Sequence, residues 1–186
     1  MISLNVQPKV RFTEALGLFW KNYVNFRGRS RRSEYWFMTL WHLIFMSPAI
    51  LLMIIGSITL FIGLSSSEDG AAALGAILLG LTLIYIAIYA IITLIPNLAL
   101  TVRRFHDISK TMFLPIFMVV YSVFVIIIVE LLPMDDFGEF TTGSTIVLVV
   151  IYILNFVLSI LMLVFSLLDS KPANKYGDSP KYPSQY

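Results

Sequence analysis

Two short polar segments of an otherwise apolar chain hold six arginines, and five of these are candidates for one binding site. The five are Arg29, Arg31 and Arg32 of FRGRSRRSEYW, and Arg103 and Arg104 of TVRRFHDISK. A guanidinium group carries five N–H donors in a planar fork that fits the oxygens of a phosphate or a carboxylate. Together these side chains would suit a phosphate group, and at a membrane surface that phosphate belongs to an anionic lipid headgroup.

A simpler role for these arginines is to orient the chain in a membrane. Basic residues beside an apolar segment stay on the cytoplasmic side and extend toward the headgroups. Orientation needs only positive charge, so lysine would serve, whereas a binding pocket would depend on the arginine fork. Both interpretations stand at the level of the sequence, and Arg→Lys substitutions would separate them.

His106 and Asp107, in the second segment, raise the question of catalysis. A histidine beside a carboxylate can transfer protons or bind a metal. Adjacent helical residues point about 100° apart, so the two side chains need not meet. A structural role is simpler: Asp107 would pair with an arginine, and His106 would cap a helix end. We therefore predict no enzyme activity, with an interfacial activity of these two residues as the exception.

Other chemistries lack the residues that they need. The chain has no cysteine and two histidines, His42 and His106, so a metal site built from such side chains in one chain is not expected. The sequence contains no HExxH, GxSxG or Walker A pattern. We predict no cofactor, no metal and no nucleic-acid partner.

The elements that must position the polar segments are membrane spans. Of the 186 residues, 58% are apolar and 13% are charged, where soluble domains carry roughly 25% charged residues. A hydrocarbon core of about 30 Å needs about 20 apolar residues in a helix, and four runs are long enough. We predict an all-α membrane protein with four transmembrane helices, at about 35–64, 71–102, 112–132 and 145–168.

The basic residues give the expected orientation. All 13 lysines and arginines fall before the first run, between the second and third, or after the fourth. An even number of spans places these segments on one side, which the positive-inside rule makes cytoplasmic, so both termini are predicted inside. We divide the chain into a cytoplasmic or interfacial arm (1–34), a four-helix transmembrane domain (35–168) and a cytoplasmic tail (169–186).

Residues 12–26 form an amphipathic pattern ahead of the first span. The apolar stripe consists of Phe12, Ala15, Leu16, Phe19, Trp20 and Tyr23. Aromatic side chains beside a lysine suit a helix that lies in the headgroup layer. We predict an interfacial helix here. The overlapping alternative is a short helix packed on the cytoplasmic ends of the spans.

Within the spans, a few residues stand out from the apolar background. Pro48 and Pro96 each remove a helix donor, so we expect a kink at Pro48 and a bend or early exit at Pro96. His42 and Asn155 are the polar side chains that could mark a transport path. An interhelical hydrogen bond is the simpler role for Asn155. A monomeric transporter is not expected, although an oligomer would be able to build a path between subunits.

Three segments together resemble one known family. They are FRGRSRRSEYWFMTLW, IPNLALTVRRFHDISKTMF and NKYGDSP. This combination resembles the domain-of-unknown-function family 805, a family of small bacterial inner-membrane proteins, over about residues 14–180. The motif residues are Gly28, Arg29, Ser33, Glu34, Trp36, Pro96, Arg103, Arg104, His106, Asp107, Asn174, Tyr176, Gly177 and Pro180. The segment ISKTMF departs from the family because it lacks a glycine and a tryptophan.

The resemblance implies a multi-pass helical protein of the bacterial cytoplasmic membrane, and it implies no activity, because none is established for the family. The motif NKYGDSP indicates a turn at Gly177. Its alternative is a lid over the arginines, paired through Asp169 or Asp178. A helical bundle would bring the three motif segments within reach of one another.

We expect a non-enzymatic membrane protein whose Arg-rich cytoplasmic face, formed by Arg29, Arg31, Arg32, Arg103 and Arg104, binds anionic lipid headgroups or a protein partner. The protein partner could be a second copy of the chain or another membrane protein. The first alternative is a small transporter or channel subunit that works as an oligomer. The second is a membrane immunity or accessory factor for a toxin system.

Overall fold

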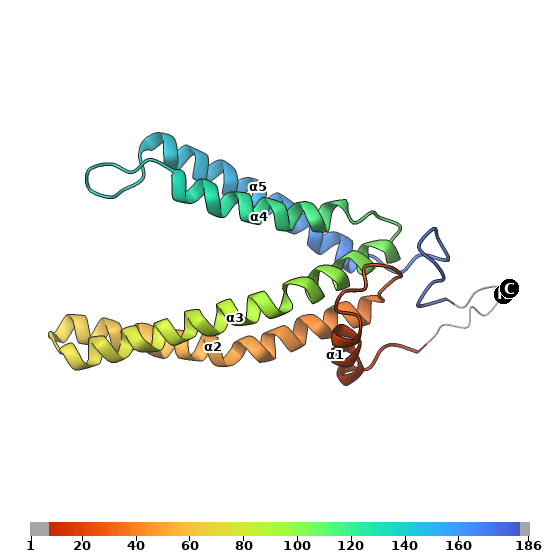
Figure 1. The fold of residues 1–186 in the computed structure, drawn as a ribbon, viewed down its shortest axis with the longest axis horizontal. Helices are drawn as coiled ribbons and strands as arrows, with labels where there is room; N and C mark the ends of the chain where they lie inside the picture. Colours follow the sequence, from red (N-terminus) through yellow and green to blue (C-terminus); the bar gives the residue numbers. More distant parts are fainter. Residues whose placement is uncertain (1–7, 183–186) are drawn as a thin grey trace. The chain divides into compact units, whose positions relative to one another are not determined.

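The computed structural model describes residues 8–182, and these residues form helices joined by short loops (Figure 1). The helices are α1 (Phe12–Lys21), α2 (Arg32–Ser66), α3 (Asp69–Asp107), α4 (Phe113–Leu131) and α5 (Thr142–Leu167). Helices α2 to α5 are long and apolar enough to cross a membrane, which confirms the predicted class and the four spans. Within the described residues no β-strand forms, and only isolated bridges occur.

Both proline-containing helices continue through their prolines. α3 runs past Pro96 to Asp107, so the early exit predicted at Pro96 does not occur. α2 likewise runs through Pro48, which has no N–H for the carbonyl of Ile44. The hydroxyl of Ser47 donates to that carbonyl at 2.8 Å, so a side chain supplies the donor that the proline removes.

The described chain divides into two compact units. The first, which we call the hairpin unit, consists of Val10–Asn25 and Ser33–Ala99. The second, which we call the clasp unit, contains Phe26–Arg32 together with Leu100 and the residues that follow it. The unit boundary in α3 therefore falls just after Pro96, and the polar end of α3 belongs to the clasp unit.

In the hairpin unit, α2 and α3 lie side by side and approach closely at two glycines (Figure 1). A methyl group at Gly63 would lie 2.6 Å from the Cα atom of Ala72, and one at Gly75 would lie 2.6 Å from the Cα atom of Leu60. No side chain fits at such distances, so glycine sets the spacing of the two helices. Small residues serve this purpose in membrane helix pairs.

His42 joins the two helices of the hairpin unit with hydrogen bonds. Its Nε2 lies 2.7 Å from Oδ1 of Asn97, and its Nδ1 bonds with the hydroxyl of Tyr89. A neutral imidazole satisfies both partners, because one ring nitrogen donates to the amide oxygen and the other accepts from the phenol. This arrangement gives His42 a packing role between α2 and α3.

Helix α1 packs on α2 in the same unit. The indole Nε1 of Trp41 donates to the carbonyl of Phe12 at 2.9 Å, and the two rings stack with centroids 4.6 Å apart. Ala15 and Phe19 are buried, whereas Trp20 and Tyr23 are exposed. One side of α1 therefore contacts protein, and two aromatic side chains near its end point outward.

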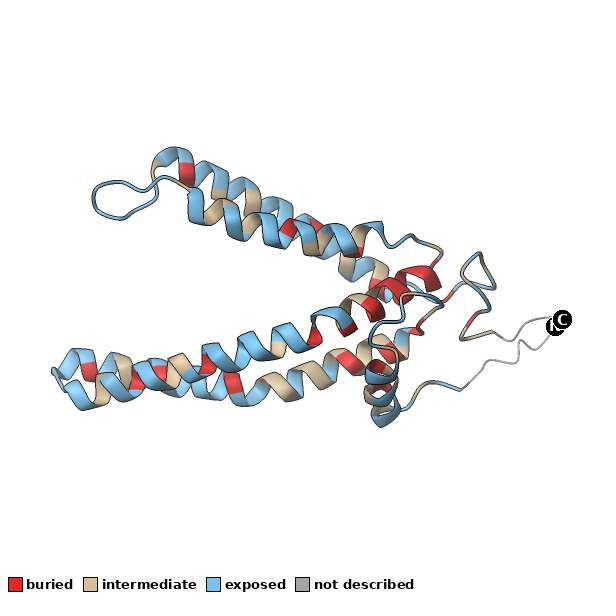
Figure 2. Cartoon of the chain, in the orientation of Figure 1, coloured by how far each residue is buried: buried red, intermediate tan, exposed pale blue. Residues whose placement is uncertain are grey.

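In the clasp unit, α4 and α5 lie side by side (Figure 1), and the Tyr121 hydroxyl donates to the carbonyl of Ile151 at 3.1 Å. The hydrogen bond described for Asn155 is with Ser159 of the same helix, at 3.5 Å, rather than between helices as expected. Burial concentrates at the end of α3, where every residue of 102–108 is buried (Figure 2). This polar helix end is the core of the unit.

Candidate functional site: an arginine clasp and a pocket beside it

The last turn of α3 carries an ion pair that is fully shielded from solvent. Nη1 of Arg104 lies 2.6 Å from Oδ2 of Asp107, and both side chains are 0% exposed. Residues three apart share one face of a helix, so this local pairing follows from the sequence spacing. Arg104 also donates to the carbonyl of Ser166 at 3.2 Å and to that of Leu168. It thereby caps the end of α5, where carbonyls lack helix donors and the helix dipole is negative.

Arg29 uses all five of its N–H donors on acceptors of the protein itself. Two go to Asp107, one to its carboxylate at 3.1 Å and one to its main-chain oxygen at 3.0 Å. The other three go to the carbonyls of Lys171, Pro172 and Gly177, at 2.5, 2.9 and 3.0 Å. A lysine has three donors on one nitrogen, so it could not make these bonds at once. The arginine fork is used here for internal bonding.

Asp107 is the common acceptor of this network. Its Oδ1 accepts from Arg29, and its Oδ2 accepts from Arg104 and from the hydroxyl of Ser170, both at 2.6 Å. Its main-chain oxygen also accepts from the backbone N–H of Lys171 at 3.1 Å. Buried charges are tolerated when they are paired and hydrogen-bonded. We call Arg29, Arg104 and Asp107 the arginine clasp, because they join three segments that are far apart in the sequence.

The tail forms the turn that NKYGDSP predicts. Asn174 and Gly177 exchange backbone hydrogen bonds of 3.1 and 2.9 Å, and Gly177 has a φ of 117°, which glycine tolerates. The side-chain amide of Asn174 donates to the carbonyl of His106 and to the hydroxyl of Ser109, each at 3.0 Å. These bonds hold the turn against the end of α3.

The acidic partner of the arginines differs from the one expected for a tail lid. Arg29 pairs with Asp107, not with Asp169 or Asp178. Asp169 pairs instead with Lys181. Hydrogen bonding from Lys181 lowers the pKa of the Asp169 carboxyl, and the same bond raises the pKa of Lys181. Both side chains are partly exposed, so this pair is worth little stability on its own.

His106 lies between the first motif segment and the tail. Its ring stacks on that of Tyr176, with centroids 3.7 Å apart and planes at 8°. Its Nδ1 is 3.2 Å from the carbonyl oxygen of Gly28, and because a carbonyl only accepts, this nitrogen carries the proton. The ring is thus a packing element that connects Gly28 to the tail turn.

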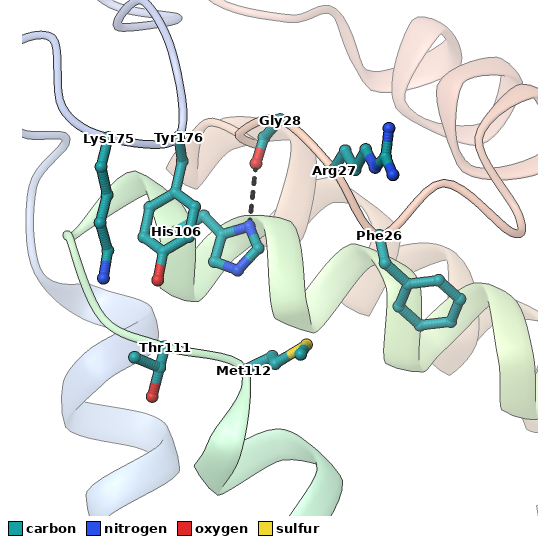
Figure 3. Close-up of a pocket in the computed structure, with 8 residues that line it drawn as sticks. All are labelled: Phe26, Arg27, Gly28, His106, Thr111, Met112, Lys175 and Tyr176. Atoms are coloured by element: carbon teal, nitrogen blue, oxygen red, sulfur yellow. Dashed lines mark hydrogen bonds between the residues drawn. The ribbon is translucent and has the colours of Figure 1, made fainter.

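A pocket of about 630 Å³ opens beside the His106–Tyr176 stack (Figure 3). It is lined by Phe26, Arg27, Gly28, His106, Thr111, Met112, Lys175 and Tyr176. Arg27 and Lys175 stand on opposite sides of the stacked rings (Figure 3), and the Lys175 ammonium lies 5.0 Å from the centroid of Tyr176. None of the lining residues is acidic. The pocket therefore combines apolar walls with two cations.

The remaining predicted arginines bond to other groups. Arg31 donates to the carbonyl of Pro8 at 2.8 Å, Arg32 to that of Leu167 at 3.2 Å, and Arg103 to the hydroxyl of Ser30 at 2.9 Å. The motif residues Glu34, Trp36 and Pro96 belong to the hairpin unit. Among residues 8–182, no three His, Asp or Glu side chains gather to hold a metal ion.

Five residues of the pocket were not singled out by the sequence. They are Phe26, Arg27, Thr111, Met112 and Lys175. The available signal was adjacency, because Arg27 directly precedes Gly28, and Lys175 stands between Asn174 and Tyr176. Because the motif residues Gly28 and Tyr176 line the pocket, the residues next to them in the sequence lie at the pocket as well.

Four membrane-length helices and a polar clasp at the end of one of them define a multi-pass helical membrane protein. The chain belongs to the family described as "Protein of unknown function (DUF805)", whose match covers residues 23–178. This confirms the resemblance seen in the motifs.

Two relatives from Escherichia coli (strain K12) support the membrane assignment. "Inner membrane protein YhaI" is 37% identical over 92 residues, which are 49% of this chain and 58% of YhaI. "Inner membrane protein YhaH" is 34% identical over 91 residues, 49% of this chain and 60% of YhaH. The chain thus matches less than two thirds of the length of these curated relatives. No solved structure matches the chain.

Proposed function

We propose that this protein is a non-enzymatic binding protein of the bacterial cytoplasmic membrane, and that its pocket takes the headgroup of an anionic lipid. The observation that carries the proposal is the pair of cations, Arg27 and Lys175, on the rim of a pocket without acidic residues. A basic residue near an anionic leaflet contributes about 1 kcal/mol to binding. The apolar side chains of Phe26 and Met112 suit the glycerol and the first acyl carbons beside a headgroup phosphate.

This proposal moves the binding role away from the five arginines of the sequence hypothesis. Arg29 and Arg104 direct their donors at carbonyls and at Asp107, so a phosphate would have to displace bonds that hold the unit together. The clasp is then the scaffold, and the exposed cations beside it contact the ligand. The positions that require arginine, Arg29 and Arg104, are therefore not the positions proposed to bind the headgroup, Arg27 and Lys175.

The proposed orientation places the pocket and both termini on the cytoplasmic side. Its support is the distribution of all 13 lysines and arginines, which flank the spans on one side. The exposed Trp20 and Tyr23 near the end of α1 suit a headgroup layer. His106 lies at the end of α3, and Thr111 and Met112 lie just before α4, so the pocket is at span ends, where lipid phosphates lie.

Lipid retention by the purified full chain tests the proposal. The probes are mixed micelles with phosphatidylglycerol, micelles with phosphatidylcholine, and soluble glycerol phosphate, with bound ligand counted by native mass spectrometry. We expect the Arg27→Gln/Lys175→Gln variant to bind phosphatidylglycerol roughly thirtyfold more weakly than the wild type, because two cations of about 1 kcal/mol each are lost.

The matched control is Lys9→Gln/Lys171→Gln, which removes two exposed lysines that do not line the pocket. This variant should retain phosphatidylglycerol like the wild type. If both variants lost the same amount of phosphatidylglycerol binding, net charge alone would explain the loss, and a specific site would be contradicted. Equal binding of glycerol phosphate and phosphatidylglycerol would show a pocket for soluble phosphate esters instead.

A further inference from the structure

The tail supplies two of the residues that line the pocket, Lys175 and Tyr176. Figure 3 shows them on the tail segment, which faces the end of α3 and the Phe26–Gly28 segment across the pocket. We call residues 169–182 the tail strap. The strap is a wall of the pocket, so the pocket is complete only while the strap is docked.

Polar bonds at three places attach the strap. Arg29 holds the carbonyls of Lys171, Pro172 and Gly177. Asn174 is bound to the end of α3, and the hydroxyl of Ser170 and the backbone N–H of Lys171 both donate to Asp107. Most strap residues between 171 and 178 are exposed. Segments with few buried apolar contacts detach at low free-energy cost, so the strap can leave while the helices stay folded.

We propose that docking of the strap and binding of the anionic ligand are one coupled equilibrium, with Arg29 and Asn174 as its positioning residues. This inference rests on the proposed function and adds its regulation. When the strap leaves, the pocket loses the Tyr176 wall and the Lys175 cation together. The ligand therefore binds the docked state more tightly, and by linkage the bound ligand must hold the strap in place by the same factor.

Arg29 acts in this scheme only through the strap. It does not line the pocket, and its donors end on the strap carbonyls and on Asp107. Replacement by lysine keeps the charge and removes the fork. A loss of ligand affinity in Arg29→Lys would therefore report positioning rather than charge.

Limited proteolysis of the full chain tests the coupling. Trypsin cleaves after lysine, and the Lys175–Tyr176 bond lies in the docked turn, so its cleavage rate reports how often the strap is released. We expect cleavage at this bond to be about tenfold slower in phosphatidylglycerol micelles than in phosphatidylcholine micelles, a typical size for coupling between sites. Cleavage at Lys9–Val10 corrects for effects of the micelles on trypsin.

Two variants measure the reciprocal effect. Arg29→Lys and Asn174→Ala should each speed cleavage at Lys175–Tyr176, and a variant whose strap is released most of the time should bind phosphatidylglycerol more weakly, in proportion to the docked fraction that it has lost. Arg11→Lys, the same substitution at an arginine of the hairpin unit, should change neither quantity. If Arg29→Lys does not fold, as judged by gel filtration and circular dichroism, Asn174→Ala decides.

The outcomes separate this inference from the proposed function. If wild-type protein binds phosphatidylglycerol but its strap is cleaved equally fast in both lipids, the proposed function stands and the coupling is wrong. Variants with a released strap and unchanged affinity overturn it as well. If wild-type protein retains no more phosphatidylglycerol than phosphatidylcholine, the proposed function is wrong, and the coupling that rests on it is wrong as well.

Discussion

At the scale of single residues, the clasp explains why arginine rather than lysine stands at 29 and 104. Arg29 bonds five acceptors, and Arg104 bonds the Asp107 carboxylate and the last carbonyls of α5. Orientation in the membrane would need only positive charge. The fork geometry is needed because backbone carbonyls from several segments must be satisfied at one point.

Asp107 is the residue on which the clasp unit depends most. Asp107→Asn keeps the shape of the side chain but leaves two buried guanidinium groups without a countercharge. Removing one partner of a buried ion pair costs about 3–5 kcal/mol, so we expect the free energy of unfolding to fall by that amount. The measurement is a denaturation curve in detergent, followed by circular dichroism.

The control for Asp107→Asn is Asp178→Asn, which removes an exposed carboxylate of the tail strap. Surface substitutions of this kind change stability by about 0.5 kcal/mol or less. If Asp107→Asn were as mild as Asp178→Asn, the charges of the clasp would contribute nothing to the fold.

At the scale of elements, the spacing of α2 and α3 depends on glycine. We expect Gly75→Ala to destabilise the hairpin unit by about 1–3 kcal/mol, because the added methyl group meets the backbone of Leu60 and forces the helices apart. Gly80→Ala is the matched control: no atom lies within 4 Å of the added methyl group, and alanine favours helix by about 1 kcal/mol. Denaturation of the two variants in the same detergent should shift in opposite directions.

The helices themselves were largely predictable from the sequence, whereas the clasp was not. Long apolar runs show where lipid replaces water as the solvent, so the four spans could be predicted from composition. The predicted ends differ from the observed helix ends by a few residues. The pairing of Arg104 with Asp107 could be read from their spacing of three. The Arg29–Asp107 pair joins residues 78 apart, and its backbone acceptors leave no mark on the sequence.

The early exit, one of the two outcomes predicted at Pro96, was wrong for a local reason. A proline in a helix removes one donor, which led us to expect a bend or an early exit at Pro96. Helix α3 continues instead to Asp107, and in α2 the hydroxyl of Ser47 replaces the lost donor at Pro48. A hydropathy pattern does not show the hydrogen bond from Ser47 to Ile44, so the pattern could not predict that a side chain replaces the missing donor.

At the scale of the whole molecule, the charge distribution predicts the orientation. The chain has no cysteine, so single cysteines can be placed freely at exposed positions. A membrane-impermeant maleimide added to cells with a permeabilised outer membrane should label Glu68→Cys and leave Lys110→Cys unlabelled, because positive loops stay inside. Labelling of Lys110→Cys alone would reverse the topology and place the pocket on the outer side.

The central claim is that Arg29 fastens the tail to the end of α3, and a cross-link in native membranes tests it most directly. The rings of His106 and Tyr176 stack with centroids 3.7 Å apart, so His106→Cys/Tyr176→Cys should join under mild oxidation or with a short thiol cross-linker. Adding Arg29→Glu should abolish the cross-link, whereas adding Arg11→Glu should leave it intact. A pair that never joins, or that joins equally well with Arg29→Glu, would contradict the account.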